Sequence, residues 1–329
     1  MPELPEVEYT ARQLRETIIG ATIQDALVFW DRTIGHPDPN DFRAEIAELR
    51  IEEVRRRAKY LIVDLAGGEQ KYILTIHRRM TGNLLLLAPG WELDTSLRER
   101  DPVAWNTKGP IFHGYTIRRT HCYSTQQGEK TEQDEEKKDF HAEIGYCRAC
   151  FILEDGRCLL FTDPRKFGRI ELWPQEQELQ ALAGLGLEPL SEAFTLEELQ
   201  ARLAGRRGNI KQALLNQEIL AGLGNIYADE ALYYARIHPL RPANTLTLEE
   251  LRLLREGIIA VLTLGIEHGG TSFSEYRDLW GEAGDNFSHV QVYQQEGKPC
   301  QRCGTLIERI VVAQRSTHFC PTCQQLIGE

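Results

Sequence analysis

The stretch CQRCGTLIERIVVAQRSTHFCPTC, residues 300–323, contains two Cys-x-x-Cys pairs separated by sixteen residues. This spacing is typical of a zinc ribbon, in which two tight turns bring four thiolates into a tetrahedron. Residues 307–312 alternate well enough to form one arm of a hairpin between the pairs. Four buried cysteines without a metal are the alternative. We expect one structural Zn²⁺, held by Cys300, Cys303, Cys320 and Cys323, with no open position for catalysis.

Upstream of this ribbon, the periodicity of the apolar residues changes between the two halves of the chain. Val7, Ala11 and Leu14 follow helical spacing, which predicts a helix close to the N-terminus that ends near Gly20. Short apolar runs between Gly or Asp turns then favour antiparallel strands. These strands are predicted at residues 71–76, 83–87, 150–153, 158–162 and 169–173. Helices are predicted in the second half at residues 196–203, 209–215, 226–235 and 248–268.

The composition is that of an acidic globular protein, with 329 residues, 42 % of them hydrophobic, and a formal net charge of −11. No segment has the length and apolarity of a membrane span, and three acids stand among the first eight residues where an export signal would be basic. We expect a cytoplasmic protein with reduced thiols. The net charge argues against DNA, which attracts Lys and Arg, but the acids concentrate in residues 129–139 and a basic run occupies residues 55–59.

A second pair, Cys147-x-x-Cys150, lies near Cys122 in the sequence. Its spacing to any further pair is irregular, so both a second metal site and free thiols remain open. Cys158 is expected in the core.

Six further segments are MPELPEVE (1–8), RRAKYL (56–61), HRRMTG (77–82), DPRKFG (163–168), AGLGNIYADE (221–230) and RSTHFCP (315–321). In this order along the chain they resemble the bacterial formamidopyrimidine-DNA glycosylase family, which is sometimes grouped with the endonuclease VIII-type enzymes. The resemblance implies an α+β multidomain fold with an N-terminal antiparallel β-sandwich flanked by helices, a helical domain with a helix-two-turn-helix element, and a β-hairpin zinc finger. The corresponding boundaries are 1–174, 175–289 and 290–329.

The segment at residues 1–8 contains groups whose reactivity can be inferred from the sequence. Removal of Met1 would leave Pro2 as a secondary amine, which can attack a sugar carbon and form an iminium, an electron sink. An α-amino group starts near a pKa of about 8 and needs little tuning to act as a nucleophile. The resemblance implies that Glu3 transfers protons beside this amine and that Lys59, expected on a strand, contacts the lesion or a flanking phosphate. Each could instead be structural, Glu3 as a helix-capping acid and Lys59 as an exposed cation.

Other segments are expected to hold DNA. Asn225 is predicted to cap a helix that begins at Ile226, so that backbone donors face a phosphate, and Lys211 would add a charge there. Arg315 on the zinc hairpin corresponds to the arginine that clamps phosphates beside the lesion, and it belongs with Pro2, Glu3 and Lys59 to the expected catalytic set.

A base inside a duplex must be flipped out before it can react, and the gap must be filled. Met80, Arg165 and Phe167 match the three gap-filling residues of the family, Phe167 as the wedge and Arg165 as the partner of the orphaned base. Core packing is the alternative for Met80 and Phe167.

The chain departs from the family pattern at residues 88–144, an acidic insertion, and just after it, at residues 145–148. The charge run at residues 126–138, inside the insertion, is expected to be a solvated loop or a disordered segment. Lys166 also stands where arginine is commoner. Three functions remain open: a bifunctional glycosylase and lyase for oxidised purines, an endonuclease VIII-type enzyme for oxidised pyrimidines, and a non-catalytic DNA-binding protein. In each case the partner is double-stranded DNA and the protein is expected to be a monomer, with no membrane partner.

Overall fold

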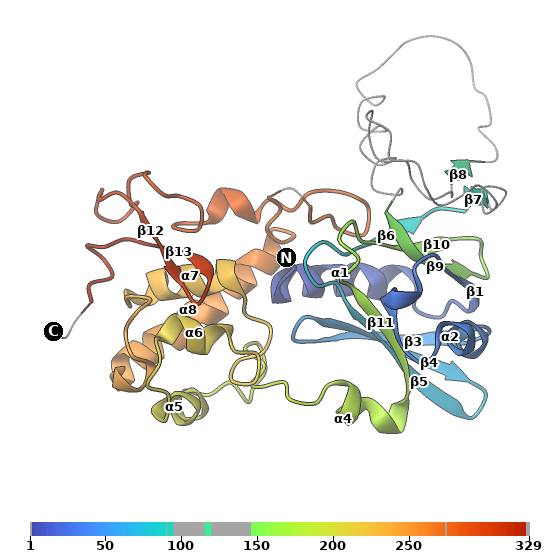
Figure 1. The fold of residues 1–329 in the computed structure, drawn as a ribbon, viewed down its shortest axis with the longest axis horizontal. Helices are drawn as coiled ribbons and strands as arrows, with labels where there is room; N and C mark the ends of the chain where they lie inside the picture. Colours follow the sequence, from blue (N-terminus) through green and yellow to red (C-terminus); the bar gives the residue numbers. More distant parts are fainter. Residues whose placement is uncertain (1, 90, 95–115, 120–145, 274, 327–329) are drawn as a thin grey trace, which may run out of the picture.

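The computed structural model describes residues 2–89, 91–94, 116–119, 146–273 and 275–326. Figure 1 shows two halves side by side, one built of β-sheets and the other of helices with a two-stranded hairpin. The N-terminal end of the chain lies between them. The α+β architecture with a C-terminal hairpin is therefore confirmed.

Two sheets form the first half. One has the strand order β1-β9-β10-β6 and is antiparallel throughout; the other has the order β2-β11-β5-β4-β3 and contains one parallel pair, β2 with β11. Side chains alternate across the strands, so Leu84 and Leu86 of β6 enter the core between the sheets while Leu85 and Leu87 join a second cluster on the outer face. The strands are β1 (Ile23–Val28), β2 (Ile34–His36), β3 (Arg50–Arg57), β4 (Tyr60–Gly67), β5 (Gln70–His77), β6 (Asn83–Leu87), β9 (Cys147–Leu153), β10 (Cys158–Thr162) and β11 (Arg169–Pro174).

Helix α1, Leu4–Thr17, connects the two halves. Its N-cap is Glu3, and a reciprocal capping box with Glu6 satisfies backbone donors of the first turn. Val7, Ala11 and Leu14 face the sandwich core, as their spacing predicts, whereas Leu4 packs into the core of the helical half. The first turn of α1 is thus held by both halves.

The second half is helical up to a short β-hairpin. Helices α7 and α8 pack against each other, and α7 also contacts strand β13 of the hairpin. Helices α2 (Pro39–Ile46) and α4 (Glu178–Ala181) belong to the sandwich and to the connection that follows it (Figure 1). The remaining elements are α5 (Leu196–Ala204), α6 (Ile210–Leu215), α7 (Asn225–Ala235), α8 (Leu248–Glu267), β12 (Glu308–Val312) and β13 (Arg315–Phe319), with single 3₁₀ turns at η1 (Asp31–Thr33), η3 (Gln175–Gln177), η4 (Ala243–Thr245) and η5 (Asn286–His289).

Within the insertion at residues 88–144 the structure describes two short strands that no sequence pattern predicted. Strands β7 (Trp91–Asp94) and β8 (Thr116–Arg119) pair antiparallel over four residues each. The rest of the acidic run, including residues 129–139, lies outside the described residues.

Candidate active site and DNA interface

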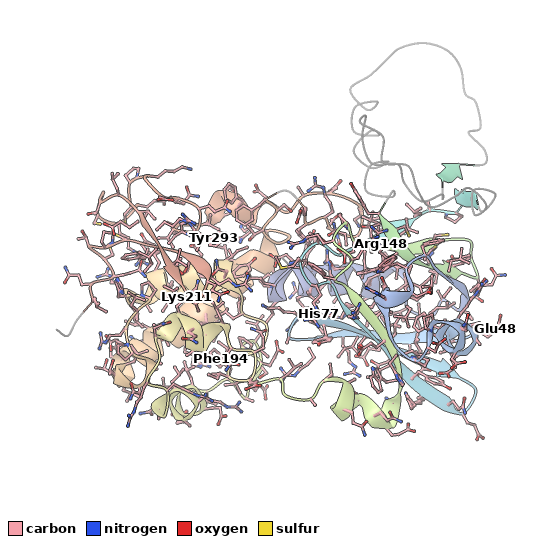
Figure 2. All side chains as sticks on the ribbon, viewed as in Figure 1. Glu48, His77, Arg148, Phe194, Lys211 and Tyr293 are labelled. Carbon is pink, nitrogen blue, oxygen red and sulfur yellow. The ribbon has the colours of Figure 1, made fainter. Side chains whose placement is uncertain are left out.

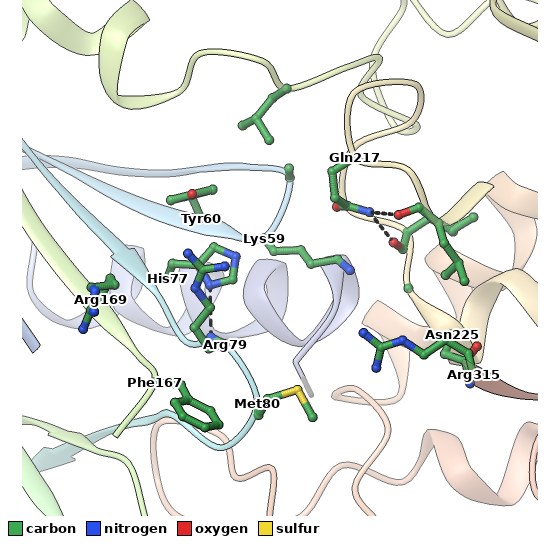
Figure 3. A pocket seen from close by; sticks show the side chains of 15 residues that line it. Lys59, Tyr60, His77, Arg79, Met80, Phe167, Arg169, Gln217, Asn225 and Arg315 are labelled. Atoms are coloured by element: carbon green, nitrogen blue, oxygen red, sulfur yellow. Dashed lines mark hydrogen bonds between the residues drawn. The ribbon is translucent and has the colours of Figure 1, made fainter. Parts of the chain in front are cut away.

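A cavity of about 750 Å³ lies between the two halves. Figure 3 shows that Lys59, His77, Met80 and Phe167 approach it from the sandwich, and Asn225 and Arg315 from the helical half and hairpin. Five of the nine predicted catalytic and DNA-binding residues line it: Lys59, Met80, Phe167, Asn225 and Arg315. Its lining is Ala58, Lys59, Tyr60, His77, Arg79, Met80, Phe167, Arg169, Leu185, Leu215, Gln217, Leu223, Gly224, Asn225 and Arg315.

The charge of this cavity is opposite to that of the whole protein. Lys59, Arg79, Arg169 and Arg315 line it, and none of its fifteen described lining residues is Asp or Glu. A chain of net charge −11 therefore concentrates cations where the halves meet. A cavity lined by one sign of charge attracts polyanions despite the opposite overall charge.

Pro2 and Glu3 lie buried next to this cavity, behind Gly224. The Oε1 atom of Glu3 accepts a hydrogen bond of 3.1 Å from the backbone N–H of Ile226, in the first turn of α7. A Cβ atom on Gly224 would stand 2.2 Å from the Glu3 carboxyl carbon, so only glycine allows this approach. The Oε2 atom of Glu3 is buried and has no hydrogen-bond partner among the described residues.

Burial dominates the protonation of the two central groups. It raises the pKa of the Glu3 carboxyl, an effect that nearby Lys59 opposes and Glu6 reinforces. It lowers the pKa of the Lys59 amine, which Glu3 and Glu6 in turn raise. Both shifts make proton exchange at these two groups easier than it is for an exposed carboxylate and an exposed ammonium.

Glu6 supports this arrangement from the first turn of α1. Its carboxylate accepts hydrogen bonds from the backbone N–H of Glu3 at 2.6 Å, the Tyr227 hydroxyl at 2.7 Å and the backbone N–H of Thr271 at 2.8 Å. One buried side chain thus ties the N-terminus to α7 and to the loop after α8.

Lys59 lies in the turn between β3 and β4, so its expected position on a strand is wrong. Ala58 has a φ of 54°, and a chain in this left-handed conformation turns instead of continuing a ladder. The Glu188 carboxylate, from the helical half, accepts hydrogen bonds from the Ala58 N–H and from the side chains of Arg56 and Arg57. This contact across the halves fixes the turn from which Lys59 extends.

The loops that carry Met80, Arg165 and Phe167 are joined by one buried carboxylate, that of Asp163. Its oxygens accept hydrogen bonds from the Thr81 hydroxyl, from the Arg165 N–H at 3.1 Å and from the Gly168 N–H at 2.7 Å. Arg165 itself does not line the cavity; its guanidinium stacks over the Phe167 ring at 5.0 Å.

Phe167 is 51 % exposed, so core packing does not explain it. The neighbouring Lys166, where the family more often has arginine, turns to the Trp30 ring at 3.9 Å.

Sequence reasoning assigned no role to His77, Arg79, Arg169 or Gln217, which also line the cavity. Burial, followed by the charges of Arg79 and Lys59, lowers the pKa of His77 to about 3, so its ring is neutral. Its Nδ1 accepts a hydrogen bond of 3.0 Å from the Arg79 backbone N–H. The family-like segment at 77–82 was the only available signal for this residue.

Lys211 does not reach the surface, and the expectation that it adds a charge to the DNA interface is wrong. Its side chain is fully buried in the helical half (Figure 2). The ammonium donates to Asp229 Oδ1 at 2.5 Å and to the Asn225 carbonyl at 3.0 Å. Asp229 also accepts from the His318 N–H, so the pair joins α6, α7 and β13.

Asn225 is the first residue of α7 and not its cap, because the N-cap is Gly224. Its side-chain amide donates a hydrogen bond of 2.7 Å to the Ser316 carbonyl of the zinc hairpin. Asn225 thereby fixes the hairpin beside the cavity, next to Arg315.

The geometry of the four terminal cysteines fits a zinc ion. The Sγ atoms of Cys300 and Cys323 are 3.9 Å apart, those of Cys303 and Cys320 are 3.5 Å apart, and all four lie within 4.8 Å of one another. Thiolates at Zn–S distances of about 2.3 Å in a tetrahedron are roughly 3.8 Å apart. Backbone N–H groups of Arg302 and Cys323 point to the sulfurs, as in zinc-binding turns.

The other cysteine pair shows no such geometry. Within the described part of the chain, Cys147 and Cys150 belong to no cluster of three or more candidate metal ligands. Cys150 and Cys158 are buried with leucines on the outer face of the sheet. Cys122 lies outside the described residues.

Comparison with known proteins agrees with this architecture. Family models match at residues 1–170 (formamidopyrimidine-DNA glycosylase N-terminal domain), 185–277 (formamidopyrimidine-DNA glycosylase H2TH domain) and 297–326 (zinc finger found in FPG and IleRS). None of the described helices is long and apolar enough to cross a membrane.

Individual relatives match along nearly the whole chain. A formamidopyrimidine-DNA glycosylase of Herpetosiphon aurantiacus is 39 % identical over 325 residues, 98 % of this chain and 100 % of that protein. The protein of the same name from Chloroflexus aurantiacus is 41 % identical over 98 % of each chain. The crystal structure of a Lactococcus lactis FPG mutant with Fapy-dG-containing DNA superposes with a TM-score of 0.76 at 32 % identity, covering 99 % of this chain and 100 % of that one. The chain belongs to the formamidopyrimidine-DNA glycosylase family.

Proposed function

We propose that this protein excises oxidised purines, including formamidopyrimidines and 8-oxoguanine, from double-stranded DNA and then cleaves the strand as a lyase. The observation that carries the proposal is the buried Pro2–Glu3 end of the chain beside a cation-lined cavity. The names of the relatives and the Fapy-dG duplex bound by the Lactococcus lactis protein support the same substrate class.

In this proposal the amine of Pro2, freed by removal of Met1, attacks the sugar carbon that carries the lesion, and the bond between that carbon and the damaged base breaks, so that the base leaves with the bonding electron pair. Opening of the sugar ring then gives an iminium at the same carbon. The resulting iminium withdraws electrons, so that elimination breaks the strand on both sides of the sugar. Glu3 holds and releases the proton that opens the sugar, since burial keeps its carboxyl protonated at higher pH than an exposed one. Lys59 contacts the lesion or a flanking phosphate from its turn.

The DNA-binding roles follow from exposure and charge. Arg315 is exposed at the cavity edge and clamps phosphates. Phe167 inserts between bases, with Met80 and Arg165 filling the gap that the flipped nucleotide leaves. Asn225 acts by holding the hairpin that presents Arg315. The boundaries 1–174, 175–289 and 290–329, the monomeric state and the cytoplasmic location complete the proposal.

Borohydride trapping on a lesion duplex tests the nucleophile. Mass spectrometry should place the DNA adduct on the N-terminal peptide of enzyme that has lost Met1. Pro2→Gly should retain a weaker activity through its primary amine, and Glu3→Gln should bind lesion DNA without releasing the base.

Two results would contradict this assignment: an adduct on Lys59, or strand cleavage by protein that retains Met1. The matched control is Glu16→Gln, which changes an acid on the same helix at a position remote from the capping box. It should leave trapping unchanged.

A set of duplexes with different lesions distinguishes an enzyme for oxidised purines from one for oxidised pyrimidines. A wild-type Lactococcus lactis FPG has been crystallised with DNA containing an oxidised pyrimidine, so the two classes must be compared directly. We expect formamidopyrimidine and 8-oxoguanine duplexes to be cut faster than oxidised-pyrimidine duplexes by the same enzyme preparation.

A further inference from the structure

The loop of residues 271–285 leaves and re-enters the helical half at one narrow point. Helix α8 ends at Glu267, and His268 is its C-cap. The chain returns beside it: the Asp285 N–H donates to the His268 carbonyl at 2.9 Å, and Thr271 pairs with Asp285 in an antiparallel bridge. A Cβ atom on Gly284 would stand 2.3 Å from two backbone oxygens, so glycine is required for this close crossing.

This crossing gathers two imidazoles and one carboxylate. The rings of His268 and His289 have centroids 3.7 Å apart, and His289 Nε2 lies 3.9 Å from Asp285 Oδ2. One ligand atom from each of the three residues lies within 4.8 Å of the others. Ligands at about 2.0–2.1 Å from one tetrahedral ion are roughly 3.3 Å apart, so the two rings must turn out of their present packing for both nitrogens to face one ion.

We propose that His268, Asp285 and His289 bind one divalent transition-metal ion of the zinc and nickel class, separate from the cysteine site. Two imidazoles and a carboxylate are the ligands that such ions select, and three protein ligands leave a position for water. The carbonyl end of α8, where His268 lies, carries partial negative charge that favours a cation. His268 and His289 are partly exposed and Asp285 is exposed, so an ion can enter from solvent.

A metal ion at this site would hold together the two ends of the loop of residues 271–285. Hydrogen bonds connect this loop to the N-terminus, where Glu3 and Glu6 lie. Next to Asp285, the Asn286 amide donates to the Thr271 hydroxyl at 2.7 Å. That hydroxyl lies 3.0 Å from the Tyr227 hydroxyl, which donates to Glu6. A bound ion would therefore join the two ends of the loop, and three hydrogen bonds connect Asn286, next to the site, to Glu6, the residue that orients Glu3.

Nickel titration of the zinc-containing protein tests the proposal. Isothermal calorimetry with Ni²⁺ should show one more site in the wild-type protein than in the His268→Gln/His289→Gln variant. Asp285→Asn should weaken that site at least about ten-fold, the effect of losing one ligand from a small set. Amide hydrogen exchange of the peptide 271–289 should slow on Ni²⁺ addition in the wild type and not in the double variant.

His36→Gln is the matched control, because it removes an imidazole that stacks on Trp173 in the sandwich. It should bind as much Ni²⁺ as the wild type, and zinc analysis should show the cysteine zinc retained throughout. Equal Ni²⁺ stoichiometry in the wild type and the double variant would overturn the proposal, leaving the two histidines as a packing pair. So would unchanged hydrogen exchange in the loop.

Discussion

The Asp163 carboxylate illustrates how a single buried residue can control exposed ones. It is fully buried, yet it accepts hydrogen bonds from the loop of Met80, through Thr81, and from the loop of Phe167, through two backbone N–H groups. The two loops that we expect to enter the DNA are thus positioned by one side chain.

Replacing Asp163 by Ala should uncouple these loops. Each backbone N–H left without an acceptor costs about 1–3 kcal/mol, so the wedge loses its fixed conformation. Single-turnover excision from lesion duplexes should fall at least ten-fold. Thr81→Val, which removes only the hydroxyl, should have a smaller effect. Equal rates in Asp163→Ala and wild type would show that the loops are ordered by the DNA itself.

His77 gives a pH-dependent prediction for stability. Its pKa in the folded protein is about 3, below the ordinary value of about 6.5 in an unfolded chain. Below about pH 6.5 the His77 imidazole binds a proton in the unfolded chain but not in the folded protein. The free energy of unfolding therefore decreases as the pH falls. Between pH 7.5 and 5.0 this residue should lower the free energy of unfolding by about 2 kcal/mol. His77→Gln should remove that part of the acid sensitivity.

Urea unfolding at the two pH values measures the difference. His36→Gln is again the control, since this ring stacks on Trp173 and does not line the cavity. The same acid sensitivity in His77→Gln as in the wild type would mean that other groups account for it.

At the scale of elements, the Lys211–Asp229 pair joins α6, α7 and β13. Removing one partner of a buried pair leaves an uncompensated charge and costs about 3–5 kcal/mol. Lys211→Met should therefore lower the free energy of unfolding by about that amount, whereas the exposed Lys298→Met should not. A variant of normal stability with weakened DNA binding would instead favour the phosphate contact expected from the sequence.

Much of the element order could be predicted, because the apolar spacing of α1, α5 and α8 and the β6 and β10 runs depends only on local pattern. Strands β1 and β2 were missed: β1 carries charged and polar residues between its apolar ones, and β2 has only three residues. The position of Lys59 depends on the left-handed Ala58 and on distant Glu188, neither of which local periodicity reports.

The zinc site was predictable from the spacing of its cysteine pairs alone, whereas Pro2 and Glu3 were singled out through a contiguous segment that resembles the family, and their roles stay predictions. Burial was not predictable. Lys211 reads as a surface cation until Asp229, eighteen residues away, is placed against it. The cluster of His268, Asp285 and His289 likewise depends on a chain crossing that no spacing rule encodes.

At the scale of the whole molecule, the protein is an acidic body with a basic cleft. DNA affinity should fall with salt because phosphate contacts release counterions, and the slope of log K against log salt reports their number. Arg315→Ala should reduce the magnitude of that slope by about 1. The control Arg12→Ala changes an exposed arginine paired with Glu8 and should leave it unchanged. An identical slope for Arg315→Ala would exclude a phosphate contact.

The N-terminus is held by residues of the second half, so the time at which it folds during synthesis depends on when those residues are made. Leu4 donates its N–H to Gly222 and Glu3 accepts from Ile226, while Glu6 accepts from Thr271. The first residues to leave the ribosome therefore obtain their partners only after more than two hundred others have been made. In the folded protein Pro2 is buried. We therefore expect the proposed nucleophile to be produced most readily on the nascent chain, before the second half has been made and packs against it, so that slower methionine removal should leave a larger share of inactive enzyme.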